Sequence, residues 1–190
     1  MSQPTDSDAR HRLLQAATAL FYQRGIPNVG INEVIDSAGV AKRTLYKHFA
    51  TKDELVLAVL SELATRREAA ITAAIDAADN PTDAILSVFR IALAARERPG
   101  FRGCAAINAA LEMAAPETAI HQFSRDFKLR LRQRLVELAS AAGSREPDLL
   151  GWQLLLLWDG ALIEAYIQQS ATPITAALAA AESLLAHARQ

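Results

Sequence analysis

Apolar residues recur at spacings of three and four along almost the whole chain, and no stretch alternates between apolar and polar positions as a half-buried strand would. The first such pattern runs from about residue 8 to 24, where Leu13, Ala17 and Phe21 share one face. Gly25 then ends it, as glycine commonly does after a helix. The pattern predicts an all-α protein of about nine helices.

Glycine, proline and asparagine residues interrupt the pattern and set the ends of the expected helices. These helices cover about residues 8–24, 31–37, 42–48, 52–78, 82–98, 103–114, 116–142, 148–169 and 173–188. Alanine and leucine dominate the apolar residues, which favours helix over strand. We expect a three-helix head over residues 1–51 and a helical body over residues 52–190.

The stretch from Ile31 to Phe49 predicts a helix-turn-helix. Two short helices are separated by Ala38-Gly39-Val40, with glycine at the position where a positive φ is expected. The apolar residues of each helix fall on one face, and Leu45 and Phe49 lie one turn apart on the second helix. The opposite face of the second helix carries Lys42, Arg43, Thr44, Tyr46, Lys47 and His48.

Cations and hydroxyl groups on one helix face are the groups that duplex DNA requires. Lysine and arginine neutralise phosphates, threonine and tyrosine hydroxyls bond phosphate oxygens, and the second helix of a helix-turn-helix enters the major groove. Lys52, at the start of the next helix, is a further candidate for phosphate binding. Residues 1–52 carry seven Lys and Arg against four Asp and Glu, a net charge of +3 in a chain whose total is −1. We therefore predict that the head binds DNA.

The first 60 residues resemble the TetR family of bacterial repressors. The resemblance rests on LLQAATALFYQRGIPNVG and INEVIDSAGVAKRTLYKHFATKDELVLAVL, with glycine after the first helix, an Ala-Gly-Val turn, Leu-Tyr-x-His-Phe, and Lys-Asp-Glu opening the fourth helix. It implies nine helices and a homodimer on a near-palindromic operator, with a small, largely apolar ligand releasing the DNA. Gly30 and Ala41 depart from the family pattern, because neither supplies the hydroxyl that commonly caps these helices.

The resemblance places a ligand site in the body, where aromatic and apolar walls with a few polar groups suit a drug-sized molecule. The candidate lining residues are Phe89, Leu93, Phe101, Cys104, Asn108, Leu111, Glu112, Phe127, Trp152 and Asp159. Cys104, Asn108 and Glu112 fall at four-residue intervals and share a face, which suits either ligand contact or helix packing. Cys104 is either a sensor of oxidants or electrophiles or a small buried hydrophobe.

The helices at about 148–169 and 173–188 are expected to pair with those of a second subunit. Leucines surround most of the first of them, which is more than one buried stripe needs, and the second is rich in alanine and leucine. The alternative is a central core helix in a monomer. Coupling between ligand and DNA is expected to pass through the long helix that begins at residue 52.

Composition excludes several other classes of function. One cysteine allows neither an internal disulfide nor a cysteine zinc site, and no catalytic, cofactor or metal motif is present, so we expect no enzyme, no cofactor and no metal. We expect no membrane span and no signal peptide, and therefore a cytoplasmic protein. An enzyme and a constitutive DNA-binding protein without a ligand are the rival hypotheses.

Overall fold

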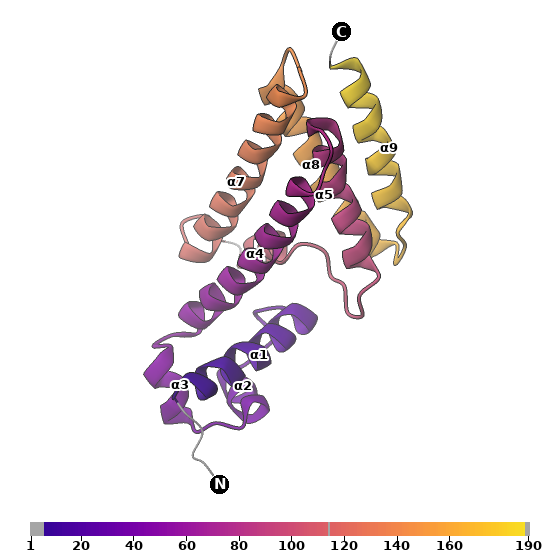
Figure 1. The fold of residues 1–190 in the computed structure, drawn as a ribbon. Coiled ribbons are helices and arrows are strands. Elements are labelled where there is room, and N and C mark those ends of the chain that lie inside the picture. Colours follow the sequence, from indigo (N-terminus) through magenta and orange to yellow (C-terminus); the bar gives the residue numbers. More distant parts are fainter. Residues whose placement is uncertain (1–5, 114, 189–190) are drawn as a thin grey trace. The chain divides into compact units, whose positions relative to one another are not determined.

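The computed structural model describes residues 6–113 and 115–188, which form nine α-helices and no strand (Figure 1). The all-α expectation is confirmed for these residues. The helices are α1 (Asp6–Arg24), α2 (Ile31–Ala38), α3 (Lys42–His48), α4 (Lys52–Asp76), α5 (Pro81–Arg96), α6 (Ala105–Glu112), α7 (Ala119–Ala141), α8 (Pro147–Ile167) and α9 (Thr172–His187).

Most helix ends lie within two residues of the expected positions, but the start of α7 does not. The sequence suggested that Pro116 opens this helix, whereas α7 begins at Ala119. Thr118 precedes it, and its side-chain oxygen accepts a hydrogen bond from the backbone N–H of His121 at 3.2 Å. This cap fixes the start of the helix, and Pro116 lies in the preceding turn.

The chain divides into two compact units, Met1–Ala64 with Ala105–Arg125, and Thr65–Cys104 with Asp126–Gln190. The first unit is larger than the head expected over residues 1–51, because it also includes the start of α4, the whole of α6 and the start of α7. Both α4 and α7 contribute residues to each unit.

The first unit is built around one apolar cluster. Leu13, Leu45 and Leu55, from α1, α3 and α4, are fully buried in it. Ala109 of α6 and Ile120 of α7 belong to the same cluster and are also buried. The reason the unit extends past residue 51 is therefore apolar packing, which no local sequence pattern reveals.

The backbone of Ile26, just after α1, is held at both its N–H and its carbonyl. Its N–H donates to Glu112 Oε2 at 2.7 Å, and its carbonyl accepts from Lys52 Nζ at 2.6 Å. Glu112 is the last residue of α6 and Lys52 the first of α4. The backbone of one residue, Ile26, thus joins the ends of three helices within the first unit.

Removing the Glu112 carboxylate is expected to destabilise the first unit. Glu112→Ala leaves the part-buried N–H of Ile26 without its acceptor, which costs about 1–3 kcal/mol of unfolding free energy. Chemical denaturation followed by circular dichroism measures the loss. The matched control is Glu117→Ala, an exposed glutamate of the same unit, which should change stability by less than about 0.5 kcal/mol. Equal stability of the two variants would contradict a stabilising role for the hydrogen bond between Ile26 and Glu112.

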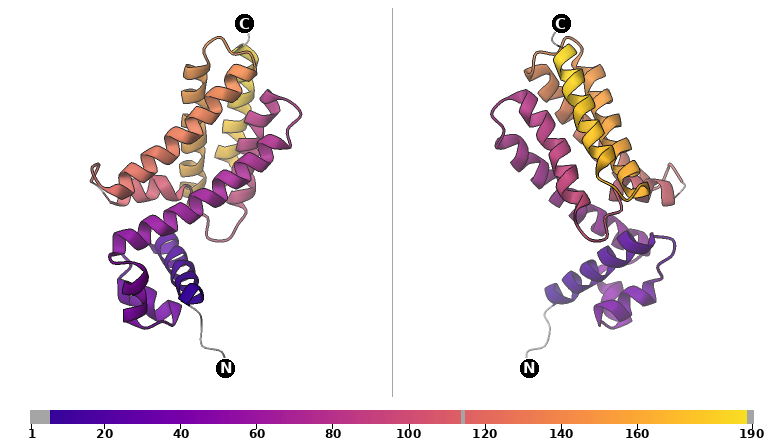
Figure 2. Two further views of the ribbon diagram at one scale, coloured as in Figure 1. Left: turned by 60° about the vertical axis from the view of Figure 1, so that its left-hand side comes forward. Right: turned by 90° about the vertical axis from the view of Figure 1, so that its right-hand side faces the viewer.

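The second unit consists of α5, α8, α9 and the parts of α4 and α7 that belong to it. Helices α8 and α9 run side by side, and α5 packs against α9 (Figure 2). Phe89 of α5 and Trp158 of α8 meet edge to face in the core, with ring centroids 6.0 Å apart. Gly151 of α8 lies so close to α7 that a Cβ there would approach Val136 Cγ2 to 2.4 Å.

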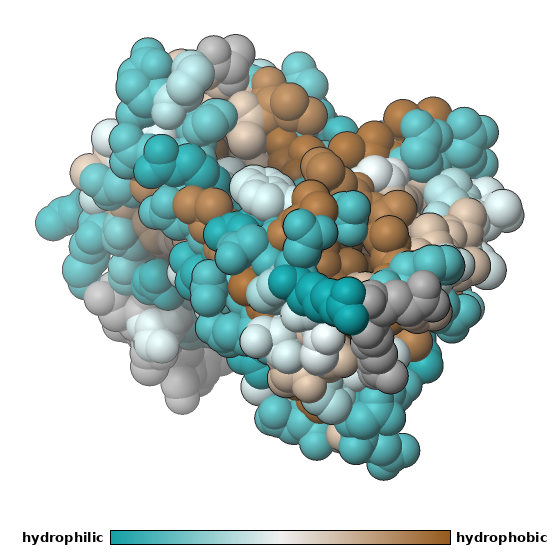
Figure 3. Space-filling view, turned by 90° about the horizontal axis from the view of Figure 1, so that it is seen from above, coloured by the Kyte–Doolittle hydropathy of each residue, from teal (hydrophilic) through white to brown (hydrophobic). Residues whose placement is uncertain are grey.

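Apolar side chains are not confined to the interior. The view from above shows hydrophobic residues reaching the surface among polar ones (Figure 3). Within the described ranges, no helix is long and apolar enough to cross a membrane.

Candidate nucleic-acid interface

The turn between α2 and α3 has the geometry that the sequence predicts. Gly39 has φ +61° and ψ +44°, which confirms the expected left-handed conformation. Its N–H donates to the carbonyl of Asp36 at 3.2 Å, and the N–H of Val40 donates to the carbonyl of Ile35 at 3.3 Å. Arg12 Nη1 donates to the carbonyls of Ala38 and Gly39, at 3.1 and 3.2 Å. The turn is therefore fixed both locally and by α1.

Helix α3 buries one face and presents the other to solvent. Leu45 and the following Phe49 are buried in the first unit's core. Lys42, Arg43, Tyr46 and Lys47 are exposed, and Thr44 and His48 are half-buried. The Tyr46 side chain is 47% exposed, an unusual position for an aromatic ring unless its hydroxyl and ring meet a partner.

Neither of the two residues that lack a capping hydroxyl makes a side-chain cap, but Gly30 bonds to Glu33 through its backbone. Gly30 makes no side-chain cap at the start of α2, but its N–H donates to Glu33 Oε2 at 3.0 Å. Arg24 Nη1 donates to Glu33 Oε1 at 2.7 Å and ties α1 to α2. Both hydrogen bonds stabilise the charged carboxylate and so lower the pKa of Glu33 below its ordinary value. The bond from Gly30 has the larger effect and the bond from Arg24 the second largest. Ala41 likewise makes no side-chain cap at the start of α3.

Helix α4 begins beside this face, as expected from Thr51. The Thr51 hydroxyl accepts from the N–H of Glu54 at 3.1 Å, and Glu54 Oε2 accepts from the N–H of Ala50 at 2.7 Å. Lys52, proposed from the sequence as a phosphate ligand, directs its ammonium to the Ile26 carbonyl and lies 5.8 Å from the centroid of the Phe21 ring. Lys52 therefore has a structural role, which the sequence did not reveal.

Four of the candidate ligand residues belong to the core of the second unit or pack against it. Phe89 is fully buried, and Leu93, Phe101 and Cys104 are partly buried against the same cluster. Phe89 is a packing residue, because its ring meets Trp158.

Three further candidates lie on α6, in the first unit. Asn108 is half-buried, Leu111 is exposed, and Glu112 is the acceptor for Ile26. The ten candidates are thus divided between the two units.

The two candidates on α8 are engaged with α7. The Trp152 ring is exposed, and the Arg132 guanidinium lies 5.1 Å from its centroid. Lys128 Nζ donates to Asp159 Oδ1. Burial raises the pKa of the Asp159 carboxyl above its ordinary value, and the positive charge of Lys128 opposes part of that rise.

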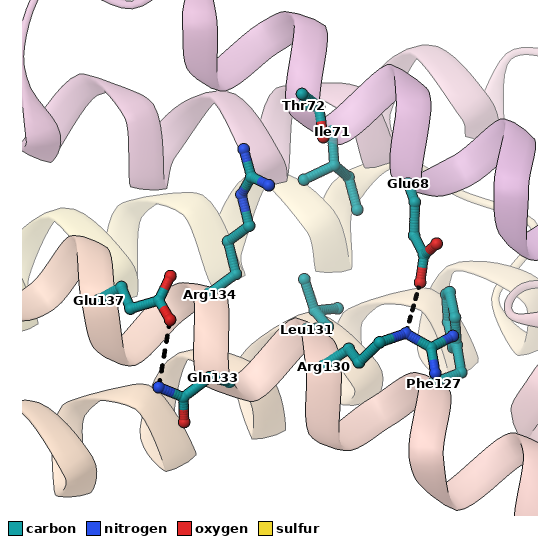
Figure 4. Close-up of a pocket in the computed structure, with 9 residues that line it drawn as sticks. All are labelled: Glu68, Ile71, Thr72, Phe127, Arg130, Leu131, Gln133, Arg134 and Glu137. Carbon is teal, nitrogen blue, oxygen red and sulfur yellow. Dashed lines mark hydrogen bonds and ion pairs between the residues drawn. The ribbon is translucent and has the colours of Figure 1, made fainter.

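A groove of about 370 Å³ separates α4 from α7 within the second unit (Figure 4). Its lining residues are Glu68, Ile71, Thr72, Phe127, Arg130, Leu131, Gln133, Arg134 and Glu137. Phe127 is the only one of the ten sequence candidates among these lining residues. The other lining residues escaped sequence reasoning because polar and aliphatic side chains on two amphipathic helices have no signature of a pocket. No group of three or more His, Cys, Asp or Glu side chains in the part of the chain that the structure describes is placed to hold a metal ion.

Comparison with known proteins agrees with this geometry. Residues 13–59 match the model of the family described as bacterial regulatory proteins, tetR family. The crystal structure of SCO4454, a TetR-family transcriptional regulator from Streptomyces coelicolor, is 32% identical in sequence and superposes with a TM-score of 0.93, covering 97% of each chain. The likeness to SCO4454 therefore extends over both units.

Two curated relatives differ in how much of this chain they match. The transcriptional activator FasR of Mycolicibacterium smegmatis is 49% identical over 53 residues, which span 28% of this chain and only 24% of FasR. The transcriptional repressor NemR of Escherichia coli is 26% identical over 195 residues, covering 98% of each protein. With a family match on the helix-turn-helix and a full-length structural relative above 30% identity, this chain belongs to the TetR family of transcriptional regulators and is a DNA-binding regulator, not an enzyme.

Proposed function

We propose that the protein is a ligand-responsive repressor that binds a near-palindromic operator as a homodimer and leaves it when a small amphiphilic ligand binds. The observation that carries the proposal is the exposed face of α3, where cations and a phenol stand on a helix whose other face is buried. Lys42, Arg43, Tyr46 and Lys47 of this face are exposed to solvent. The face matches the phosphates and base edges of a major groove.

A dimer is supported by an apolar stripe along α8. Leu149, Trp152, Leu156, Ile163 and Ile167 recur at helical spacing and are all exposed. Gly160 lies in the same stripe, and a Cβ built there would meet nothing within 4 Å. A second copy of α8 would cover these side chains and approach closely at Gly160. Two recognition helices about 34 Å apart would then read the two halves of the operator.

Repression, rather than activation, is supported by a relative that aligns over nearly the whole chain. NemR is a repressor and aligns over 98% of this chain, whereas the alignment with the activator FasR spans only 28% of this chain. The more extensive of these two likenesses is therefore to a repressor.

A response to ligand is supported by the groove in the second unit and by the continuity of its walls. Helices α4 and α7 line the groove and both continue into the first unit. A ligand that binds one arrangement of these helices better than another would shift the protein toward that arrangement.

The DNA-binding proposal is tested by titrating purified protein onto DNA from upstream of its own gene, at several salt concentrations. A Tyr46→Ala/Lys47→Ala double variant is expected to bind the DNA about 10- to 100-fold more weakly. The slope of log affinity against log salt concentration should also decrease in magnitude by about one per subunit. Both side chains are exposed, so the fold should be unaffected. Fluorescence anisotropy measures the affinities.

The matched control is Arg145→Ala, which removes one exposed cation from the second unit. It should leave the affinity within about twofold of the wild type. If this DNA is not bound selectively, selection from genomic fragments supplies the operator. A double variant that binds the selected operator as tightly as the wild type would refute the assigned role of α3.

A further inference from the structure

We infer that the groove between α4 and α7 binds a small amphiphilic carboxylate, with Arg134 holding the carboxylate and apolar side chains holding its hydrocarbon part. The inference rests on the proposed ligand response and names the class of ligand. It depends on three features of the groove. Its floor is apolar, the other charged side chains of its rim are hydrogen-bonded within the described part of the chain, and Arg134 is not.

The floor of the groove is apolar. Ile71 of α4 and Leu131 of α7 are buried and point toward each other across it, and Phe127 lies at one end (Figure 4). The volume of about 370 Å³ lies within the range of about 300–1,000 Å³ that is typical of small-molecule pockets. A short alkyl chain or a single aromatic ring therefore suits the floor.

The other charged groups of the rim already have partners. Arg130 Nε donates to Glu68 Oε1 at 3.0 Å, and the Arg130 guanidinium lies 6.0 Å from the centroid of the Phe127 ring. Gln133 Nε2 donates to Glu137 Oε1 at 3.2 Å along the outer side of α7. Figure 4 shows the Glu68–Arg130 pair joining α4 to α7 beside Phe127, and the Gln133–Glu137 pair on α7 at the other end.

Arg134 differs from these groups. Its side chain is half-buried and extends from α7 toward α4, next to Thr72 (Figure 4). Among residues 6–113 and 115–188 it makes no hydrogen bond and no ion pair. An arginine offers five N–H donors in a planar fork that matches a carboxylate in a bidentate pair. A cationic ligand would be repelled by Arg134, and a neutral one would leave its donors unused.

The inference is tested by calorimetric titration of the full chain, without DNA, using hexanoate, octanoate, decanoate and 4-phenylbutyrate. At least one of these is expected to bind saturably, with one site per chain. The matched amphiphiles 1-octanol and octylamine separate the contribution of the ligand's carboxylate charge from that of its hydrocarbon part. Octanol is expected to bind at least tenfold more weakly than octanoate, and octylamine more weakly still.

Two variants locate the site. Arg134→Gln should weaken carboxylate binding at least tenfold and leave the affinity for octanol unchanged. The charge-matched control Arg145→Gln should change neither affinity. Thr72→Trp fills the groove and should abolish the binding of both carboxylate and alcohol. Thermal unfolding of each variant verifies that it is folded.

Absence of saturable binding by all four carboxylates would overturn the inference, as would equal carboxylate affinity of Arg134→Gln and the wild type. Because these titrations contain no DNA, their outcome does not depend on the operator. Arg134-dependent binding that leaves the DNA complex intact would support the site and refute the proposed ligand response. Operator binding unaffected by any carboxylate, together with no binding in calorimetry, would refute the site and leave the DNA-binding role standing.

Discussion

Leu156→Glu is expected to convert the proposed dimer into folded monomers. The Leu156 side chain is 65% exposed in the single chain and lies in the middle of the apolar stripe of α8. In the dimer each glutamate would be buried against the partner helix without a counter-ion, at a cost of about 4 kcal/mol, or about a thousandfold in the dissociation constant of the dimer. Sedimentation equilibrium measures this constant.

The monomer itself should remain as stable as before, because an exposed side chain contributes little to its packing. We expect the unfolding free energy of the Leu156→Glu monomer to change by less than about 0.5 kcal/mol. Operator affinity should fall with dimerisation, since one recognition helix would then contact only half the site. Leu111→Glu is the control, because it makes the same change at another exposed leucine, on α6. A Leu156→Glu protein that remains a dimer would exclude the stripe as the interface.

Gly151→Val should destabilise the second unit by about 3 kcal/mol. A Cβ at this position would lie 2.4 Å from Val136 Cγ2 and 3.3 Å from the Val136 backbone nitrogen, so α7 and α8 would have to move apart. Alanine and valine are both better helix formers than glycine, by less than about 1 kcal/mol, so the clash outweighs the gain in propensity. Thermal and chemical denaturation measure the loss.

A double-mutant cycle attributes the loss to this one contact. Gly151→Ala should be destabilising in the wild type and close to neutral in a Val136→Ala background, because Val136→Ala removes the nearest atom. Gly160→Ala, on the same helix, is the control, since its Cβ would meet nothing within 4 Å. It is measured in the Leu156→Glu background so that dimerisation does not contribute. Equal costs of Gly151→Ala in both backgrounds would contradict the proposed contact.

The sequence predicted the features that depend on local interactions. The conformation of Gly39, the cap provided by Thr51 and the buried face of α3 all follow from residues within one or two helical turns. Helix periodicity and turn residues are sufficient for such features. For the same reason, the residues of α3 proposed to bind DNA could be chosen before the structure was known.

Features that depend on distant residues could not be predicted in this way. Glu112 accepts a hydrogen bond from Ile26, 86 positions away, and no local pattern in the sequence indicates this contact. The groove at Arg134 depends on how α4 and α7 pack, and neither helix carries a local pattern that indicates a space between them. Tertiary packing decides such contacts, and periodicity reports only which face of each helix is apolar.

The participation of α6 in the first unit has a consequence for the order of events during synthesis. Ala109 and Ile120 complete the apolar core that contains Leu45 of α3. Both residues are translated well after Leu45. A nascent chain that has emerged only to Ala64 therefore leaves part of that core open to water and the N–H of Ile26 without its acceptor. The ribosome must release the chain to about residue 125 before the first unit can close. A message truncated after α4 would yield a fragment that contains α3 but lacks the α6 and α7 residues that complete its apolar core.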